Sequence, residues 1–175
     1  MGVEIERRFL VQNEPPINME KGAHIIQCYL PQNDWLDVWG EDCDDIENLL
    51  LESNTTFRLR IMDNVAFATI KGSSDGARRF EFEKKVDYEV VKNIVNSKKF
   101  PCVEKQRIFL PVEDGLFWEI DLFVGENSGL IIAEIEIPDP EHPITLPNWL
   151  DKEITGEDEV WSNYSLAINP LSNRN

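Results

Sequence analysis

Charged side chains recur at alternate positions in most segments of the chain that look like β-strands. The first group is Glu4, Glu6 and Arg8, and pairs with the same spacing follow along the sequence. Alternate residues of a strand point to the same side, so the members of each group share one face. The positions between them are mostly Ile, Leu, Val and Phe. The acids of this face are Glu4, Glu6, Glu81, Glu83, Glu119, Asp121, Glu134 and Glu136, and the bases are Arg8, Arg58, Arg60, Lys71, Arg79, Lys85, Lys105 and Arg107.

The signs of these charges are sorted by segment. Arg58 and Arg60 form a purely basic pair, whereas Glu134 and Glu136 form a purely acidic one. Neighbouring like charges weaken a sheet unless something neutralises them. Carboxylates without His or Cys favour hard cations such as Mg²⁺ or Mn²⁺, and Arg with Lys favours phosphate oxygens. The pattern therefore fits a site for a metal–polyphosphate complex, although the solvated face of a half-buried sheet shows the same alternation.

Eight segments are expected to be strands, mostly joined by short turns such as Asp63-Asn64 and Asp114-Gly115. The sheet should therefore be largely antiparallel. The segments are 4–11, 23–30, 56–62, 65–71, 79–86, 104–110, 117–124 and 130–137.

Helices are expected at three places. In the acidic segment 34–53, Ile46, Leu49 and Leu50 predict a short helix from about Asp44, with a solvated acidic loop as the alternative. Asp87 is a candidate N-cap for a helix that ends near residue 97. Trp161, Tyr164 and Ile168 indicate an amphipathic helix over 157–168. We expect a single domain over 1–170, with the acidic segment as an insertion and a frayed tail over 171–175.

The composition limits the possible partners. The 175 residues suffice for one domain with a core, and the net charge of −16 argues against nucleic acid or an anionic membrane as a partner. No signal peptide or apolar membrane span is expected. The three cysteines show no paired spacing, which favours a reducing, cytoplasmic setting. The apolar outer faces of the strands leave room for a homodimer.

Two arrangements of such a sheet satisfy the pattern. The sheet can lie open, with its apolar face on helices and its charged face in water. Alternatively it can close into a barrel with the charges inside and helices over part of its apolar exterior. The alternation of residues by itself leaves both arrangements open.

The ordered set of charged motifs resembles the CYTH-domain family, the triphosphate tunnel metalloenzymes. Glu4-x-Glu6-x-Arg8 is similar to the ExExK signature of that family, with Arg8 in place of Lys. The other matching motifs are Gln27-x-Tyr29-Leu30, Arg58-x-Arg60, Thr69-x-Lys71, Arg79-x-Glu81-x-Glu83, Lys105-x-Arg107, Glu119-x-Asp121, Glu134-x-Glu136 and Lys152-Glu153-x-Thr155.

The resemblance implies a mainly β fold, in which about eight antiparallel strands close into a tunnel with a charged lumen, flanked by helices. It implies Mg²⁺ or Mn²⁺ as cofactor, and it assigns the site residues as follows. The metal ligands would be Glu4, Glu6, Asp121, Glu134 and Glu136. The residues that bind triphosphate would be Arg8, Arg58, Arg60, Lys71, Arg79, Lys105, Arg107 and Lys152, and those involved in catalysis would be Glu4, Glu6, Arg8, Lys71 and Tyr29. The supporting residues would be Glu81, Glu83, Glu119 and Glu153.

The expected function is metal-dependent hydrolysis of a triphosphate, above all inorganic tripolyphosphate. Adenylate cyclase and thiamine triphosphatase are the alternatives within the family. A non-catalytic module that binds polyphosphate or nucleotide is the alternative from another class, and Arg8 in place of Lys makes it credible. Glu159-Val160-Trp161 stands where the family usually carries Arg-Tyr, and this difference affects how one end of the tunnel is closed.

Overall fold

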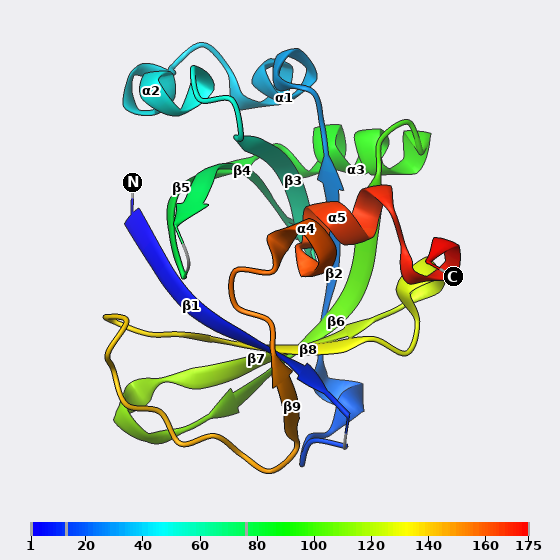
Figure 1. Ribbon diagram of the computed structural model, residues 1–175. Coiled ribbons are helices and arrows are strands. Elements are labelled where there is room, and N and C mark those ends of the chain that lie inside the picture. Colours follow the sequence, from blue (N-terminus) through cyan, green and yellow to red (C-terminus); the bar gives the residue numbers. More distant parts are fainter. Residues whose placement is uncertain (1, 13, 76, 175) are drawn as a thin grey trace.

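Nine antiparallel strands form one sheet, and eight of them close into a barrel (Figure 1). The computed structural model describes residues 2–12, 14–75 and 77–174. The strand order is β5-β4-β3-β2-β6-β7-β8-β1-β9, and an additional pairing of β5 with β1 closes the barrel. The expected tunnel architecture is thereby confirmed, and the open sheet is excluded. The strands are β1 (Gly2–Val11), β2 (Ala23–Tyr29), β3 (Thr56–Met62), β4 (Val65–Asp75), β5 (Arg78–Val86), β6 (Cys102–Pro111), β7 (Phe117–Phe123), β8 (Ile131–Glu136) and β9 (Leu150–Glu153).

The register of the strands turns the charged face inward. Arg58 of β3 lies opposite Thr69 of β4, and Arg107 of β6 lies opposite Asp121 of β7. The alternate positions form the outer, apolar face, where Leu59 and Ile70 are fully buried. A barrel buries this apolar face only where other elements cover it, and two covering layers are present.

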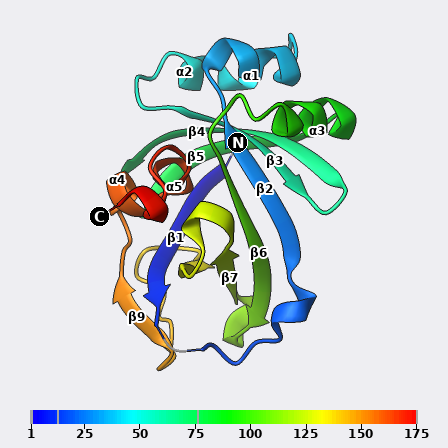
Figure 2. The ribbon, with the colours of Figure 1, turned by 90° about the vertical axis from the view of Figure 1, so that its right-hand side faces the viewer.

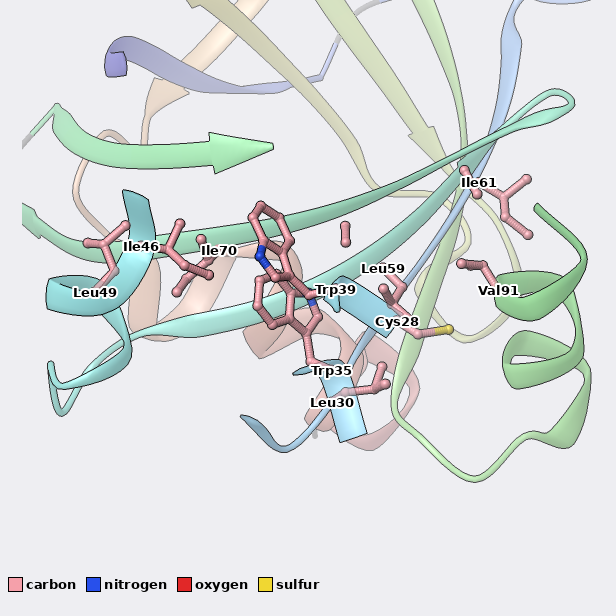
Figure 3. Close-up of a cluster of buried hydrophobic side chains, with 12 residues drawn as sticks. Cys28, Leu30, Trp35, Trp39, Ile46, Leu49, Leu59, Ile61, Ile70 and Val91 are labelled. Carbon is pink, nitrogen blue, oxygen red and sulfur yellow. The ribbon is translucent and has the colours of Figure 1, made fainter. Parts of the chain in front are cut away.

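The first covering layer consists of helices over β3 and β4 (Figure 3). Trp35 and Trp39 of one helix stack at 4.7 Å between ring centroids and are both buried. Val91 of another helix is buried in the same cluster. These helices are α1 (Gln32–Trp39), α2 (Glu47–Leu50) and α3 (Tyr88–Ser97).

Two of these three helices match the sequence expectations. Asp87 caps α3 by accepting a hydrogen bond from the backbone N–H of Val90 at 2.9 Å. The short helix expected from about Asp44 is present as a 3₁₀ turn (Asp44–Ile46) followed by α2. Helix α1 was not expected, because its two buried tryptophans stand among polar residues and the contacts that bury them come from β3 and β5.

The second covering layer lies over the outer face of β6, β7 and β8. The long connection between β8 and β9 brings Trp149 against Trp118, whose rings meet edge to face at 5.8 Å. Phe9 of β1 contacts Trp118 in the same way at 5.7 Å. A third cluster, around Ile154 and Leu166, joins the C-terminal helices to the barrel.

The C-terminal segment lies across one end of the barrel, where its last helix contacts β6 and β2 (Figure 2). It forms two helices, α4 (Asp158–Trp161) and α5 (Asn163–Ile168), rather than the single helix expected over 157–168. The break is at Ser162, whose extended backbone ends α4 and whose side chain caps α5. Of the expected apolar stripe, Trp161 packs against the barrel, whereas Tyr164 and Ile168 are exposed and Leu166 is buried instead.

Two further expectations need correction. Cys28 and Cys102 face each other across β2 and β6 and form a disulfide, whereas the sequence indicated unpaired cysteines. Neither β-strand pairing nor their separation of 74 residues can be read from local spacing. Residues 171–174 are not a frayed end, because Arg174 donates hydrogen bonds to the carbonyls of Asn169 and Val160, both at 2.8 Å. Within the described ranges, no helix is long and apolar enough to span a membrane.

Candidate active site

A cavity of about 650 Å³ runs through the lumen of the barrel. This volume lies within the range of small-molecule sites. Most of the site residues expected from the sequence line it: Glu4, Glu6, Arg8, Tyr29, Arg58, Arg60, Lys71, Arg79, Glu81, Lys105, Arg107, Glu119, Glu134 and Glu136. Four expected residues do not line it: Glu83, Asp121, Lys152 and Glu153.

One wall of the cavity pairs bases of β3 with an acid of β5. Arg58 and Arg60 both donate hydrogen bonds to Glu83, at 3.1 and 2.9 Å. Arg58 also contacts the hydroxyl of Thr69, which in turn donates to Glu83 at 2.6 Å. Glu83 therefore lies behind the two arginines and holds them in place; its supporting role in the reaction stays a prediction. The like charges that seemed to need a ligand are partly neutralised by the neighbouring strands.

Lys71 lies between two carboxylates on the adjacent part of the wall. Its ammonium group is 2.9 Å from Glu4 and 2.6 Å from Glu81. Despite burial, Lys71 and Arg58 lower the pKa of Glu81 to about 2. Glu81 is thus ionised at all ordinary pH values and holds Lys71 in its charged form.

The opposite wall contains a buried group of charges on β6 and β7. Asp121 is fully buried and accepts two hydrogen bonds from Arg107 at 2.7 Å and one from Lys105 at 2.5 Å. These two cations hold the pKa of Asp121 well below its ordinary value, against the effect of burial. Burial lowers the pKa of Lys105 to about 8. Asp121 holds both cations, which line the lumen, and is not itself among the residues that line it.

The acidic side of the lumen is formed by β1 and β8. Glu6 lies opposite Glu136, and Arg8 lies opposite Glu134 in the strand register. Burial, together with the nearby carboxylates of Glu134 and Glu4, raises the pKa of Glu6 to about 8. A carboxylate crowded in this way would be stabilised by a bound cation.

The donor chemistry of this side fits a hard divalent cation, because it offers carboxylates alone. The side chains are not yet arranged as a coordination sphere: among the described residues, no three His, Cys, Asp or Glu side chains are grouped so that they could hold a metal ion. Glu134 accepts a hydrogen bond from Arg8 at 3.0 Å, and Glu4 accepts one from Lys71. A metal would therefore have to compete with these two bases for the carboxylate oxygens.

The raised pKa of Glu6 leads to a prediction about stability. Between its ordinary pKa of 4.5 and about 8, the folded protein keeps a proton on Glu6 that the unfolded chain has lost. The free energy of unfolding therefore falls as the pH rises through this window. In EDTA, Glu6→Gln should melt at a higher temperature than the native protein at pH 8, and this advantage should vanish toward pH 4.5. Melting curves across this range test it, with Glu41→Gln as an exposed control; parallel curves for Glu6→Gln and the native protein would contradict it.

The C-terminal helices contribute to the cavity through residues that were not expected from the sequence. Asp158 of α4 accepts a hydrogen bond from Arg79 at 2.6 Å, and the carbonyl of Trp161 accepts one from Arg8 at 3.0 Å. Asn163 of α5 accepts a hydrogen bond from Lys105 at 3.0 Å. The segment after the Lys152-Glu153-x-Thr155 motif thus touches three of the basic residues. The signals in the sequence were its proximity to that motif and Glu159-Val160-Trp161, which stands where the family usually carries Arg-Tyr.

Tyr29 is held from two sides. Its hydroxyl accepts a hydrogen bond from the side chain of Gln27 at 2.9 Å, and its ring contacts Tyr164 edge to face at 5.4 Å. Burial raises the pKa of its hydroxyl, although Arg58 and Lys71 act in the opposite direction. Tyr29 therefore stays neutral and acts as a polar wall group near the two cations; a catalytic role for it remains a prediction.

Two expected residues lie away from the lumen. Lys152 is on β9 and pairs with Glu157, its side chain being 58% exposed. Glu153 receives two hydrogen bonds from Arg7, both at 2.8 Å, on the outer face of the barrel. Neither is in a position to contact a ligand in the cavity. The Arg7–Glu153 pair instead links β1 to β9, and the Lys152–Glu157 pair links β9 to the loop that leads to α4.

Comparison with known proteins agrees with this geometry. No family model matches the chain. The chain is 32% identical over 174 residues to an inorganic triphosphatase of Acetivibrio thermocellus, covering 99% of this chain and 98% of that protein. The chain belongs to the inorganic triphosphatase family. A second inorganic triphosphatase, from Nitrosomonas europaea, is 29% identical and covers 94% of this chain and 97% of that protein.

A solved structure extends the family likeness to three dimensions. The crystal structure of an inorganic triphosphatase superposes on this chain with a TM-score of 0.62 at 26% identity, over 96% of each chain. A putative adenylate cyclase from Bacillus halodurans shares the fold alone, with a TM-score of 0.55 at 16% identity over 81% of this chain and 85% of that chain. As a member of the family, this chain is an enzyme of the triphosphate-hydrolysing class.

Proposed function

We propose that this protein hydrolyses inorganic tripolyphosphate to diphosphate and orthophosphate. The observation that carries the proposal is the enclosed lumen, in which basic residues of four strands face the carboxylates of β1 and β8. Membership of the inorganic triphosphatase family supports the same substrate. A chain of phosphates is a linear polyanion, and a tunnel lined by cations binds it along its length.

The basic residues of the two walls would both bind the substrate and stabilise the charge that develops on it during the reaction. Arg58, Arg60 and Lys71 on one wall, with Lys105 and Arg107 on the other, bind the phosphate oxygens. The other charges fix these positions before the substrate arrives: Glu83 holds the two arginines of β3, Asp121 holds the two bases of β6, and Lys71 pairs with Glu4 and Glu81. Cations placed in this way stabilise the charge that develops on the transferring phosphoryl group and on the diphosphate leaving group.

We further propose Mg²⁺ or Mn²⁺ as the cofactor, bound by Glu4, Glu6, Glu134 and Glu136. Two observations support this site: all of its donors are carboxylates, and burial beside Glu134 and Glu4 raises the pKa of Glu6. When bound, the cation would neutralise phosphate charge and lower the pKa of a water molecule. Asp121 is left out of this set, because Arg107 and Lys105 already occupy its oxygens.

One experiment separates the alternatives. Purified protein is incubated with tripolyphosphate, ATP or thiamine triphosphate, each with Mg²⁺ or Mn²⁺ and with EDTA as control. Release of orthophosphate from tripolyphosphate in the presence of metal supports the proposal. Formation of cyclic AMP from ATP would indicate an adenylate cyclase, and faster cleavage of thiamine triphosphate than of tripolyphosphate would indicate a thiamine triphosphatase. Binding without turnover would indicate a non-catalytic module.

Replacing Arg58 by Ala should weaken substrate binding. Arg58 is buried in the wall and lines the cavity. Hydrogen bonds to charged groups contribute about 1.5–3 kcal/mol, so KM for tripolyphosphate should rise roughly 10- to 150-fold while kcat changes less. Steady-state kinetics measure both constants, and Lys99→Ala, at an exposed site, should leave both unchanged. A fall in kcat at constant KM would show that Arg58 acts on the transition state alone.

Cellular location and assembly remain predictions. The Cys28–Cys102 disulfide counts against the cytoplasmic location expected from the sequence, because such bonds are rare in a reducing cytosol. For the expected homodimer, the exposed Val3 and Phe80, which face each other across β1 and β5, offer a small apolar surface.

A further inference from the structure

The wall of the barrel is thin where β1 and β5 part. These strands pair only from Gly2 to Ile5 of β1. Beyond that point, the backbone N–H of Glu6 donates to the carbonyl of Ala77 at 3.2 Å, and that of Arg8 donates to the hydroxyl of Thr155 at 3.0 Å. Contacts to a turn and a loop therefore replace strand pairing on this side of β1 from Glu6 to Arg8, and pairing resumes with β9 at Phe9.

A small pocket lies at this stretch, with a volume of about 20 Å³ for the centres of water molecules. A single ordered water needs roughly 10–15 Å³ by the same measure, so the pocket has room for one. Ala77 and Thr155 line it on the wall side. We call this space the side pocket.

The side pocket shares its inner residues with the tunnel. Glu4, Glu6, Arg8, Arg79 and Asp158 line both spaces. The Nε atom of Arg79 is buried and has no hydrogen-bond partner among the described residues, while its Nη2 is bound by Asp158. A buried polar atom of this kind beside a water-sized, polar space is the usual setting of a structural water.

From this arrangement we propose that the side pocket holds the water molecule that attacks the terminal phosphate. The inference rests on the proposed hydrolysis of tripolyphosphate. Substrate would fill the lumen, and the side pocket borders the lumen beside Glu4 and Glu6, so a water molecule held there would lie next to the substrate. The water oxygen bonds to the terminal phosphorus, and the bond from that phosphorus to the bridging oxygen breaks, its electron pair leaving with diphosphate. One proton of the water stays on orthophosphate and the other passes to solvent.

The size of the side pocket can be changed at Ala77. Ala77→Val should narrow it and Ala77→Gly should widen it, and Ser73→Val introduces the same side chain at an exposed position of the same hairpin as a control. Each protein is assayed with tripolyphosphate and metal in water containing methanol, which competes with water as the attacking group. The ratio of methyl phosphate to orthophosphate is measured by phosphorus NMR. Because both products come from the same active molecules, the ratio does not depend on the folded fraction.

We expect Ala77→Gly to raise the ratio at least threefold and Ala77→Val to lower it by a similar factor, with kcat of Ala77→Val reduced about tenfold at unchanged KM. Any other pattern overturns the inference, including equal ratios in all proteins, a fall of kcat without a change in ratio, or no methyl phosphate from any of them. If the native protein releases no orthophosphate from tripolyphosphate, the proposed function itself fails, which is a different result.

Discussion

Glu136→Gln should reduce kcat for tripolyphosphate by about 100-fold or more, with the fold intact. Glu136 lines the cavity opposite Glu6, on the side where the carboxylates of β1 and β8 gather. An amide has nearly the same shape, but it carries no charge and binds a hard divalent cation poorly. A catalytic metal contributes several kcal/mol to charge stabilisation, and each 1.36 kcal/mol corresponds to a factor of ten in rate.

Steady-state kinetics over a range of Mg²⁺ and Mn²⁺ concentrations provide the measurement. Glu104→Gln is the matched control, because Glu104 is an exposed residue of β6 paired with His24 on the outer surface. The control should keep the native kcat and the native metal dependence. A near-native rate for Glu136→Gln at low metal concentration would remove Glu136 from the proposed metal site.

Asp121→Ala should destabilise the protein rather than alter metal affinity. The change leaves Lys105 and Arg107 buried without the carboxylate that both now contact. Removing one partner of a buried ion pair costs about 3–5 kcal/mol. For a chain of this size, that corresponds to a fall in Tm of roughly 6–20 °C. Thermal melting in EDTA measures the effect without any contribution from metal binding.

The measurement in EDTA also separates the two roles considered for Asp121. The resemblance to the family implied a metal ligand, whose loss would leave the metal-free protein as stable as before. The contacts of Asp121 instead indicate a counter-ion that orients two bases. Asp151→Ala, at an exposed position of β9, should leave the Tm unchanged and so controls for the loss of an acid. Native stability of metal-free Asp121→Ala would contradict the counter-ion role.

The sequence predicted the strands and the faces of their residues well, because alternation is a local property. Glu4, Glu6 and Arg8 share a face in any strand that contains them, whatever that strand packs against. The same holds for Asp87, whose side chain caps α3 through the backbone only three residues away. Local physics therefore determined which residues could form a charged surface and which could form a core.

Local pattern alone could not decide the closure of the sheet. It depends on pairing of β1 with β5, whose partners Glu4 and Arg79 are 75 residues apart by their numbers, and no local preference encodes that contact. The family resemblance pointed to closure, and the pairing shows it. The Cys28–Cys102 bond was missed for the same reason, since its two residues meet only after β2 and β6 pair.

Tertiary structure also decided what each charge does within the site. From the sequence, Asp121 and Glu134 were equivalent carboxylates of neighbouring strands. In the fold, Asp121 is enclosed by Arg107 and Lys105, whereas Glu134 lines the cavity. Asp158 and Asn163 reach Arg79 and Lys105 only because α4 and α5 fold back onto the barrel. The sequence by itself determined the types of charge and the strand faces that carry them, and the long-range packing decided which of these charges neutralise one another and which face the lumen.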